Sequence, residues 1–63
     1  MNFANNLKQI RNKMGISQEE LAERIGVRQS AIANYEAGTR YPRLDQVEGI
    51  AKALKTSIED LLK

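Results

Sequence analysis

The chain has neither cysteine nor histidine among its 63 residues, and it contains no tryptophan and a single proline. Without cysteine, disulfides and thiolate zinc sites are excluded. Without histidine, the chain lacks the side chain that most often serves as a metal ligand or as a general base near neutral pH. We therefore expect no metal, no cofactor and no enzymatic activity.

Long apolar runs are also missing, since no stretch approaches the roughly 18 residues of a membrane-spanning helix. The N-terminal stretch MNFANNLKQIRNKM has no apolar block and no small-residue cleavage site of the kind found in secretion signals. The length suits one small domain, residues 1–63. The sequence thus predicts a single-domain cytoplasmic protein.

The charges are unevenly distributed, although ten basic against eight acidic residues give a net charge of only +2. Residues 24–43 hold four arginines and one acid, Glu36, and residues 1–14 hold three basic residues and no acid. Residues 44–63 carry a slight negative excess. A polyanion facing the first 43 residues would explain this division, and ordinary solvated charge is the alternative.

Apolar spacing and capping residues predict two helices in the first part of the chain. Residues Phe3, Leu7, Ile10 and Met14 are spaced as one helical face, which a glycine follows. The stretch ISQEELAERIG then begins with Ser17 and has Glu20 three residues later, which is the pattern of a capping box. The inward face of this helix is made by Leu21, Ala22 and Ile25, and Gly26 ends the helix.

The stretch RQSAIANYEAG predicts a third helix with an unusual outer surface. Ile32 and Tyr35 form its buried stripe. The opposite side carries short polar side chains, a methyl group and a guanidinium, with no carboxylate: Arg28, Gln29, Ser30, Ala33 and Asn34.

Two further helices follow a loop in which Pro42 prevents helix continuation. The fourth is expected to turn five apolar residues inward: Leu44, Val47, Ile50, Ala51 and Leu54. Gly49, inside this helix, lowers its stability by about 0.5–1 kcal/mol relative to alanine. The fifth begins after Ser57 and has an apolar side made of Ile58, Leu61 and Leu62. Five short helices without a strand pattern predict a compact all-α domain.

The connection between the second and third helices contains Gly26, Val27 and little else, which is typical of a helix-turn-helix. The helix-turn-helix pattern covers residues 18–37, and nearly the whole chain resembles the phage-repressor and Cro type of regulator, also called the Xre type. The resemblance extends from LKQIRNKMGISQEELAERIGV to IAKALKTSIEDLL. It implies a five-helix, lambda-repressor-like DNA-binding domain with its helix-turn-helix at helices two and three.

The resemblance also implies roles for particular residues. Four of them would lie at base edges or at the entrance of the major groove: Arg28, Gln29, Ser30 and Asn34. Gln18 would meet a DNA phosphate. Arg11 and Glu36 would form an ion pair, with Arg11 also touching a phosphate. The chain departs from the family pattern at Arg28 and Arg43, where many members have a capping Ser or Thr, so both helix starts are expected to be less firmly fixed.

The outer surface of the third helix suits a groove about 12 Å wide, because short side chains allow close approach and carboxylates would face phosphates. Gln29 or Asn34 can pair with adenine, Arg28 with guanine, and the Ala33 methyl group can meet a thymine methyl group. A merely polar, exposed helix is the alternative interpretation.

The loop after the third helix supplies candidate phosphate contacts in Thr39, Arg40 and Arg43, with plain solvation as the alternative. Tyr41 is expected either to pack over the edge of the core or to hydrogen-bond a phosphate.

We therefore predict a sequence-specific regulator of transcription, a repressor of phage or bacterial origin, that binds double-stranded DNA at a palindromic operator. One domain offers few base contacts, so a weak homodimer on DNA is expected. Its contacts would come from Ile58, Leu61 and Leu62 or from the loop around Tyr41. One alternative is an antitoxin or coactivator-like module that uses the same fold to bind protein. Another is a piece of a longer regulator.

Overall fold

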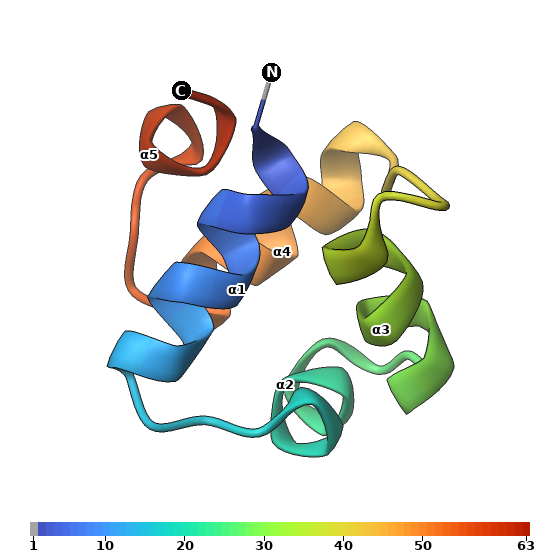
Figure 1. The fold of residues 1–63 in the computed structure, drawn as a ribbon. Coiled ribbons are helices and arrows are strands. Elements are labelled where there is room, and N and C mark those ends of the chain that lie inside the picture. The colour runs from blue at the N-terminus through green and yellow to red at the C-terminus, as the bar shows by residue number, and fades with distance from the viewer. Residues whose placement is uncertain (1) are drawn as a thin grey trace.

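The computed structural model describes residues 2–63, and these residues form five helices without a strand (Figure 1). The helices are α1 (Phe3–Lys13), α2 (Gln18–Ile25), α3 (Gln29–Ala37), α4 (Leu44–Ala53) and α5 (Ile58–Leu62). The predicted all-α, five-helix architecture is confirmed.

Local capping chemistry explains where several helices begin. The Ser17 hydroxyl accepts a hydrogen bond from the backbone N–H of Glu20 at 3.0 Å, and Ser57 caps α5 in the same way. Both predicted caps are therefore confirmed. In contrast, Arg28 and Arg43 occupy the cap positions of α3 and α4 without a side-chain cap bond. These two helix starts depend on packing rather than on a cap.

The core draws on all five helices and on the connections between them. Its buried apolar residues are Phe3, Leu7, Ile16, Leu21, Ala22, Ile32, Tyr35, Val47, Ile50, Ala51, Leu54 and Leu61. Helix α3 packs against α1 and α2, while α4 contacts α2 and α5. In Figure 1, α3 lies at the edge of the molecule away from α5. One long face of α3 is consequently left uncovered.

Three expectations about apolar residues were wrong. Met14 and Leu44 were assigned to inward faces, but they are 42% and 67% exposed. Met14 is the C-cap residue of α1 and Leu44 is the first residue of α4. Each therefore lies beyond the part of its helix that packs against the core. Leu61 was offered as a dimer contact, yet it is fully buried. It is part of the core and is not available to a second copy.

The loop between α3 and α4 is packed onto the start of α1. The rings of Tyr41 and Phe3 lie 5.1 Å apart between centroids, and Pro42 is buried. Tyr41 thus packs over the edge of the core, as one of its two expected roles required. Among residues 2–63, no helix combines the length and the apolar character needed to span a membrane.

Candidate nucleic-acid interface

The turn between α2 and α3 is built on a glycine that no other residue would replace easily. Gly26 has φ +74°, in the left-handed region that strains residues with a Cβ. The next N–H, of Val27, donates to the carbonyl of Ala22 at 3.0 Å and closes the end of α2. Val27 packs against the core and Arg28 starts α3 directly afterwards. This short connection joins α2 to α3 in the helix-turn-helix order predicted from the sequence.

Helix α3 is held from beneath by two buried side chains. Ile32 is fully buried, and the hydroxyl of the buried Tyr35 donates to Gln46 Oε1 of α4 at 2.7 Å. On the outer side, Arg28, Gln29 and Ser30 are exposed. Because Ser30 and Asn34 are four residues apart, they share a helical face. The half-buried Asn34 thus lies beside the exposed residues that were expected to read bases.

Glu36 is the only acid of residues 24–43, and it is turned away from this outer surface. Arg11 donates to it through Nε and Nη2, the latter at 3.0 Å, and the side chains of Arg11 and Glu36 are only 9% and 4% exposed. A third bond from Arg11, through Nη1, reaches the carbonyl of Ile16 at 2.7 Å. The pair therefore joins α1, α3 and the loop before α2.

The electrostatics of this pair favour the charged forms. Burial opposes ionisation of Glu36, but hydrogen bonds from Arg11 and Gln18, with the charges of Arg11 and Lys8, outweigh it and lower its pKa below the ordinary value. The hydrogen bond to Glu36, opposed by burial, raises the pKa of Arg11. Glu36 is thus an ionised carboxylate whose charge is neutralised inside the protein, so α3 presents no free carboxylate outward.

Two glutamines extend this network to the surface. Gln18, the first residue of α2, donates through Nε2 to Glu36 Oε1 at 3.1 Å. Its own Oε1 accepts from Gln29 Nε2 at 3.4 Å. The residue expected to meet a phosphate and a residue expected to meet a base therefore touch each other. Through Gln18, the amide of Gln29 is oriented by the buried ion pair.

A similar arrangement holds the other end of the surface. The Thr39 hydroxyl donates to the side-chain Oδ1 of Asn34 at 3.1 Å, and its backbone N–H donates to the Asn34 carbonyl at 3.0 Å. Thr39 itself is exposed at the start of the loop. The loop therefore orients the amide of Asn34, and the hydroxyl proton of Thr39 is engaged in that contact.

The arginines divide into exposed and buried ones. Arg28 and Arg40 are exposed and form no ion pair with any of residues 2–63. Arg43 is also exposed and lies 3.5 Å from Asp45 in a solvated pair. Arg11 differs, because its guanidinium is buried and occupied by Glu36 and Ile16. Arg28, Arg40 and Arg43 can reach an anion with little rearrangement, whereas the geometry of Arg11 is that of a structural residue. The fourth exposed arginine, Arg24, lies 3.6 Å from Glu20.

Two residues that the sequence analysis missed also support this region. Lys8 is exposed on α1, and its charge contributes to the lowered pKa of Glu36. Its position three residues before Arg11, on the same helical face, was a signal available in the sequence. Gln46, which fixes the Tyr35 hydroxyl, gave no such signal. The two residues lie eleven apart on different helices.

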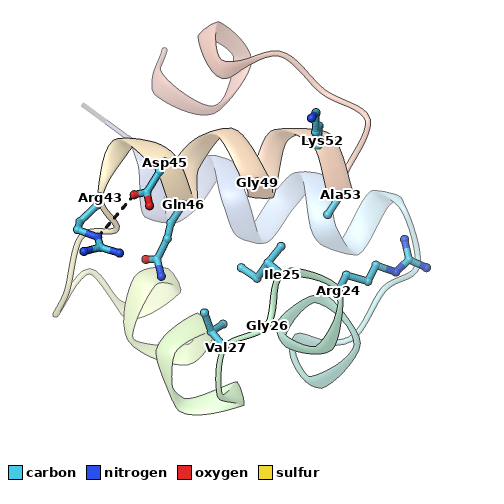
Figure 2. Close-up of a pocket in the computed structure, with 10 residues that line it drawn as sticks. All are labelled: Arg24, Ile25, Gly26, Val27, Arg43, Asp45, Gln46, Gly49, Lys52 and Ala53. Carbon is cyan, nitrogen blue, oxygen red and sulfur yellow. Dashed lines mark ion pairs between the residues drawn. The ribbon is translucent and has the colours of Figure 1, made fainter.

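A groove of about 570 Å³ lies behind the turn, between the end of α2 and α4 (Figure 2). Figure 2 shows Ile25 and Val27 reaching toward α4, where Gly49 contributes no side chain. The groove does not include Gln29, Ser30 or Asn34. It is therefore a separate feature from the outer surface of α3.

Known proteins with this sequence pattern are regulators of transcription. The control protein C.BamHI of Bacillus amyloliquefaciens is 41% identical over 61 residues, which covers 95% of this chain and 75% of that protein. The HTH-type transcriptional activator BcrR of Enterococcus faecalis is 36% identical over 62 residues, or 98% of this chain, which spans only 30% of the activator's length.

Among solved structures, the master regulator for biofilm formation SinR in complex with DNA superposes with a TM-score of 0.90. It is 31% identical, and the match covers 97% of this chain and 98% of that one. The Helix-turn-helix family model HTH_3 matches residues 7–61. With the turn at Gly26 and the outward face of α3, this match shows that the chain belongs to the HTH_3 family, the Cro-like and Xre-type helix-turn-helix regulators of transcription.

Proposed function

We propose that this chain inserts α3 into the major groove of a palindromic operator, binds there as a pair of copies, and represses transcription by occupying a promoter. The observation that carries the proposal is the acid-free outer face of α3. The one acid of helix α3, Glu36, is bound on the inner side of the helix by Arg11 and Gln18. Phosphates on both sides of the groove therefore meet no negative charge from this helix.

In this arrangement base edges are read by Arg28, Gln29, Ser30 and Asn34. An amide can pair with adenine N6 and N7, and a guanidinium can pair with guanine O6 and N7. The orientation of both amides supports such reading, because Gln18 holds Gln29 and Thr39 holds Asn34 before DNA arrives. Pre-positioned groups lose less entropy on binding.

Phosphate contacts would come from the edges of the same face. We assign them to Gln18, Thr39, Arg40 and Arg43, with Lys8 as a further candidate. Arg11 would contribute only through an N–H that Glu36 and Ile16 leave unused. Such contacts position the helix on any duplex and carry little sequence information.

The relatives support regulation in either direction, since one is called a transcriptional activator and another a phage transcriptional repressor. Repression follows from the simplest use of a small domain, which is to block a promoter by occupancy. The proposed activity needs neither a metal nor a cofactor and involves no catalysis. It would take place on the nucleoid in the cytoplasm.

The test begins with selection of bound sites from random duplex DNA, which yields the operator. Gln29→Ala and Asn34→Ala should each weaken operator binding by about 1–3 kcal/mol while leaving binding to random DNA and its salt dependence unchanged. Gln9→Ala is the matched control, since Gln9 is an exposed glutamine on α1. It should bind the operator as the parent does.

If both α3 variants bind the operator as tightly as the parent, α3 does not read the sequence. A protein-binding module, such as an antitoxin or a coactivator, would then be the better account. Binding to one co-purifying protein that is insensitive to salt would point the same way, because binding to DNA weakens steeply as salt rises.

A further inference from the structure

Thr39 and Asn34 are joined at the end of α3 by backbone and side-chain hydrogen bonds. The backbone N–H groups of Thr39 and Arg40 donate to the Asn34 carbonyl, at 3.0 and 3.4 Å. The Thr39 hydroxyl lies 3.1 Å from the side-chain Oδ1 of Asn34 and 3.3 Å from the same carbonyl. A hydroxyl has one proton to donate. The oxygen that receives this proton determines how the Asn34 amide is turned.

The side-chain oxygen is the better acceptor for this proton. A carbonyl oxygen has two lone pairs, and the Asn34 carbonyl already accepts from two backbone N–H groups. Oδ1 is also the nearer of the two oxygens to the hydroxyl. The proton therefore goes to Oδ1. This contact turns the amide oxygen toward the loop and the amide nitrogen, Nδ2, away from Thr39.

The amide nitrogen of Asn34 is available to a ligand. In the side-chain hydrogen bonds of residues 2–63, Asn34 takes part only as an acceptor, through Oδ1 and its carbonyl. No buried polar side-chain atom of these residues lacks a partner, so Nδ2 is at the surface. It lies on the helical face that Asn34 shares with the exposed Ser30. Asn34 thus presents two N–H donors, and its acceptor is turned away.

We infer that Thr39 makes Asn34 a reader of guanine, an inference that rests on the function proposed above. An asparagine reads adenine with both ends of its amide, because adenine offers N7 as an acceptor and N6 as a donor. Guanine offers two acceptors, N7 and O6, which a lysine ammonium also recognises. An amide that presents only N–H groups matches guanine and is opposed by the amino group of adenine. Thr39 is thus a positioning residue that selects a base without touching it.

Gln29, the other amide of the outer surface, is held by its opposite end. Its Nε2 donates to Gln18 Oε1 at 3.4 Å, which uses one of its two N–H groups. The amide oxygen and the second N–H of Gln29 remain, and these are the two groups that adenine needs. Two side chains with the same functional group are therefore expected to read different bases, because different ends of them are held.

This geometry also bears on the phosphate contact proposed for Thr39. Phosphate oxygens accept hydrogen bonds, but the hydroxyl and the backbone N–H of Thr39 both donate to Asn34. A phosphate contact would require the hydroxyl to leave Oδ1. The two roles of Thr39 therefore exclude each other, and they predict different results when the hydroxyl is removed.

The experiment selects bound sites from random duplex DNA with the purified parent and four variants, and then titrates duplexes that differ at one base pair. Asn34→Ala identifies the pair that Asn34 reads, since the preference there disappears. In the parent this pair should be G·C, preferred over A·T by about 5–150-fold, the range for one good base contact. Thr39→Val keeps the shape of the side chain without its hydroxyl. It should lose this preference, because the released amide can turn its oxygen outward and pair with adenine.

Two further variants serve as controls. Thr39→Ser keeps the hydroxyl and should keep the preference for G·C. Thr56→Val is the matched control, because Thr56 lies between α4 and α5 and α3 is at the edge of the molecule away from α5 (Figure 1). It should select the same site as the parent. Thermal unfolding of both Thr39 variants should match the parent, since Thr39 is exposed.

A preference for G·C that persists in Thr39→Val would overturn the inference. A parent that reads A·T through Asn34 would also overturn it, as would an Asn34→Ala variant with an unchanged site. Uniform weakening of Thr39→Val on all sequences, with the base preference intact, would assign the hydroxyl to a phosphate instead. In each of these cases the parent still binds its operator specifically, so the proposed function would stand. If the parent showed no sequence preference on any DNA, the proposed function and this inference would both fall.

Discussion

Replacing Glu36 by alanine should destabilise the protein by about 3–5 kcal/mol, the range observed when one partner of a buried ion pair is removed. The structure places this pair in that class, because the side chains of Arg11 and Glu36 are 9% and 4% exposed. The change removes the acceptor of three hydrogen bonds, two from Arg11 and one from Gln18. It also leaves a guanidinium buried without its counter-ion.

A loss of this size is comparable with the total stability of the domain. Globular proteins are stable by about 0.05–0.15 kcal/mol per residue, which for this chain is roughly 3–9 kcal/mol. Glu36→Ala should therefore be largely or wholly unfolded near 25 °C. Glu36→Gln, which keeps the shape and one acceptor oxygen, should lose less and remain measurable.

The assay is urea unfolding followed by far-ultraviolet circular dichroism, on Arg11→Ala, Glu36→Ala and the double variant, with Glu36→Gln as the milder substitute. Because each single change orphans the other partner, the double variant should lose clearly less than the sum of the two. Arg24→Ala is the matched control: its pair with Glu20, at 3.6 Å, is exposed and should contribute under about 1 kcal/mol. Additivity within about 0.5 kcal/mol would refute a coupled pair.

Acid should destabilise the protein through Glu36: its pKa is lowered on folding, so its contribution is full above the ordinary value of 4.5 and is lost as the pH falls through the folded value. Urea melts from pH 7 to pH 2 should show this slope, and Glu36→Gln should flatten it. Arg40→Ala should weaken binding to operator and random DNA alike and reduce the slope of log affinity against log salt by about 0.9. An unchanged slope would show that Arg40 is a solvated charge that contacts no phosphate. Gly49→Ala should stabilise the fold by about 0.5–1 kcal/mol, because a Cβ there would meet nothing within 4 Å. A lower melting temperature for that variant would show that the groove behind the turn needs the glycine.

Much of the local structure was determined by the sequence alone. Short-range interactions, which act over three or four residues, account for the caps at Ser17 and Ser57 and for the glycine in the turn. They can therefore be predicted without knowledge of the rest of the chain. The same holds for the stripe of Ile32 and Tyr35 and for the absence of acids on the other side of α3. The order of the helices and the all-α class follow from such short-range signals, whereas the lambda-repressor-like fold was implied by the resemblance to a known family.

The tertiary structure decided which ends of those stripes enter the core. Periodicity alone assigned Met14 and Leu44 to inward faces and offered Leu61 as an outward contact, and all three were wrong. A residue at a helix terminus is buried only if another helix extends over it. The angles at which the helices cross determine how far they overlap. The spacing of apolar residues within one helix does not predict these angles.

The contacts that orient the candidate interface were also decided at this level. The links from Gln18 to Gln29, from Tyr35 to Gln46 and from Arg11 to the Ile16 carbonyl depend on side-chain directions after the helices have packed. Residue types in the sequence supplied the hydrogen-bonding groups. Only the packed chain brought them within 3.5 Å, because each of these bonds either joins separate helices or anchors a helix to a neighbouring loop.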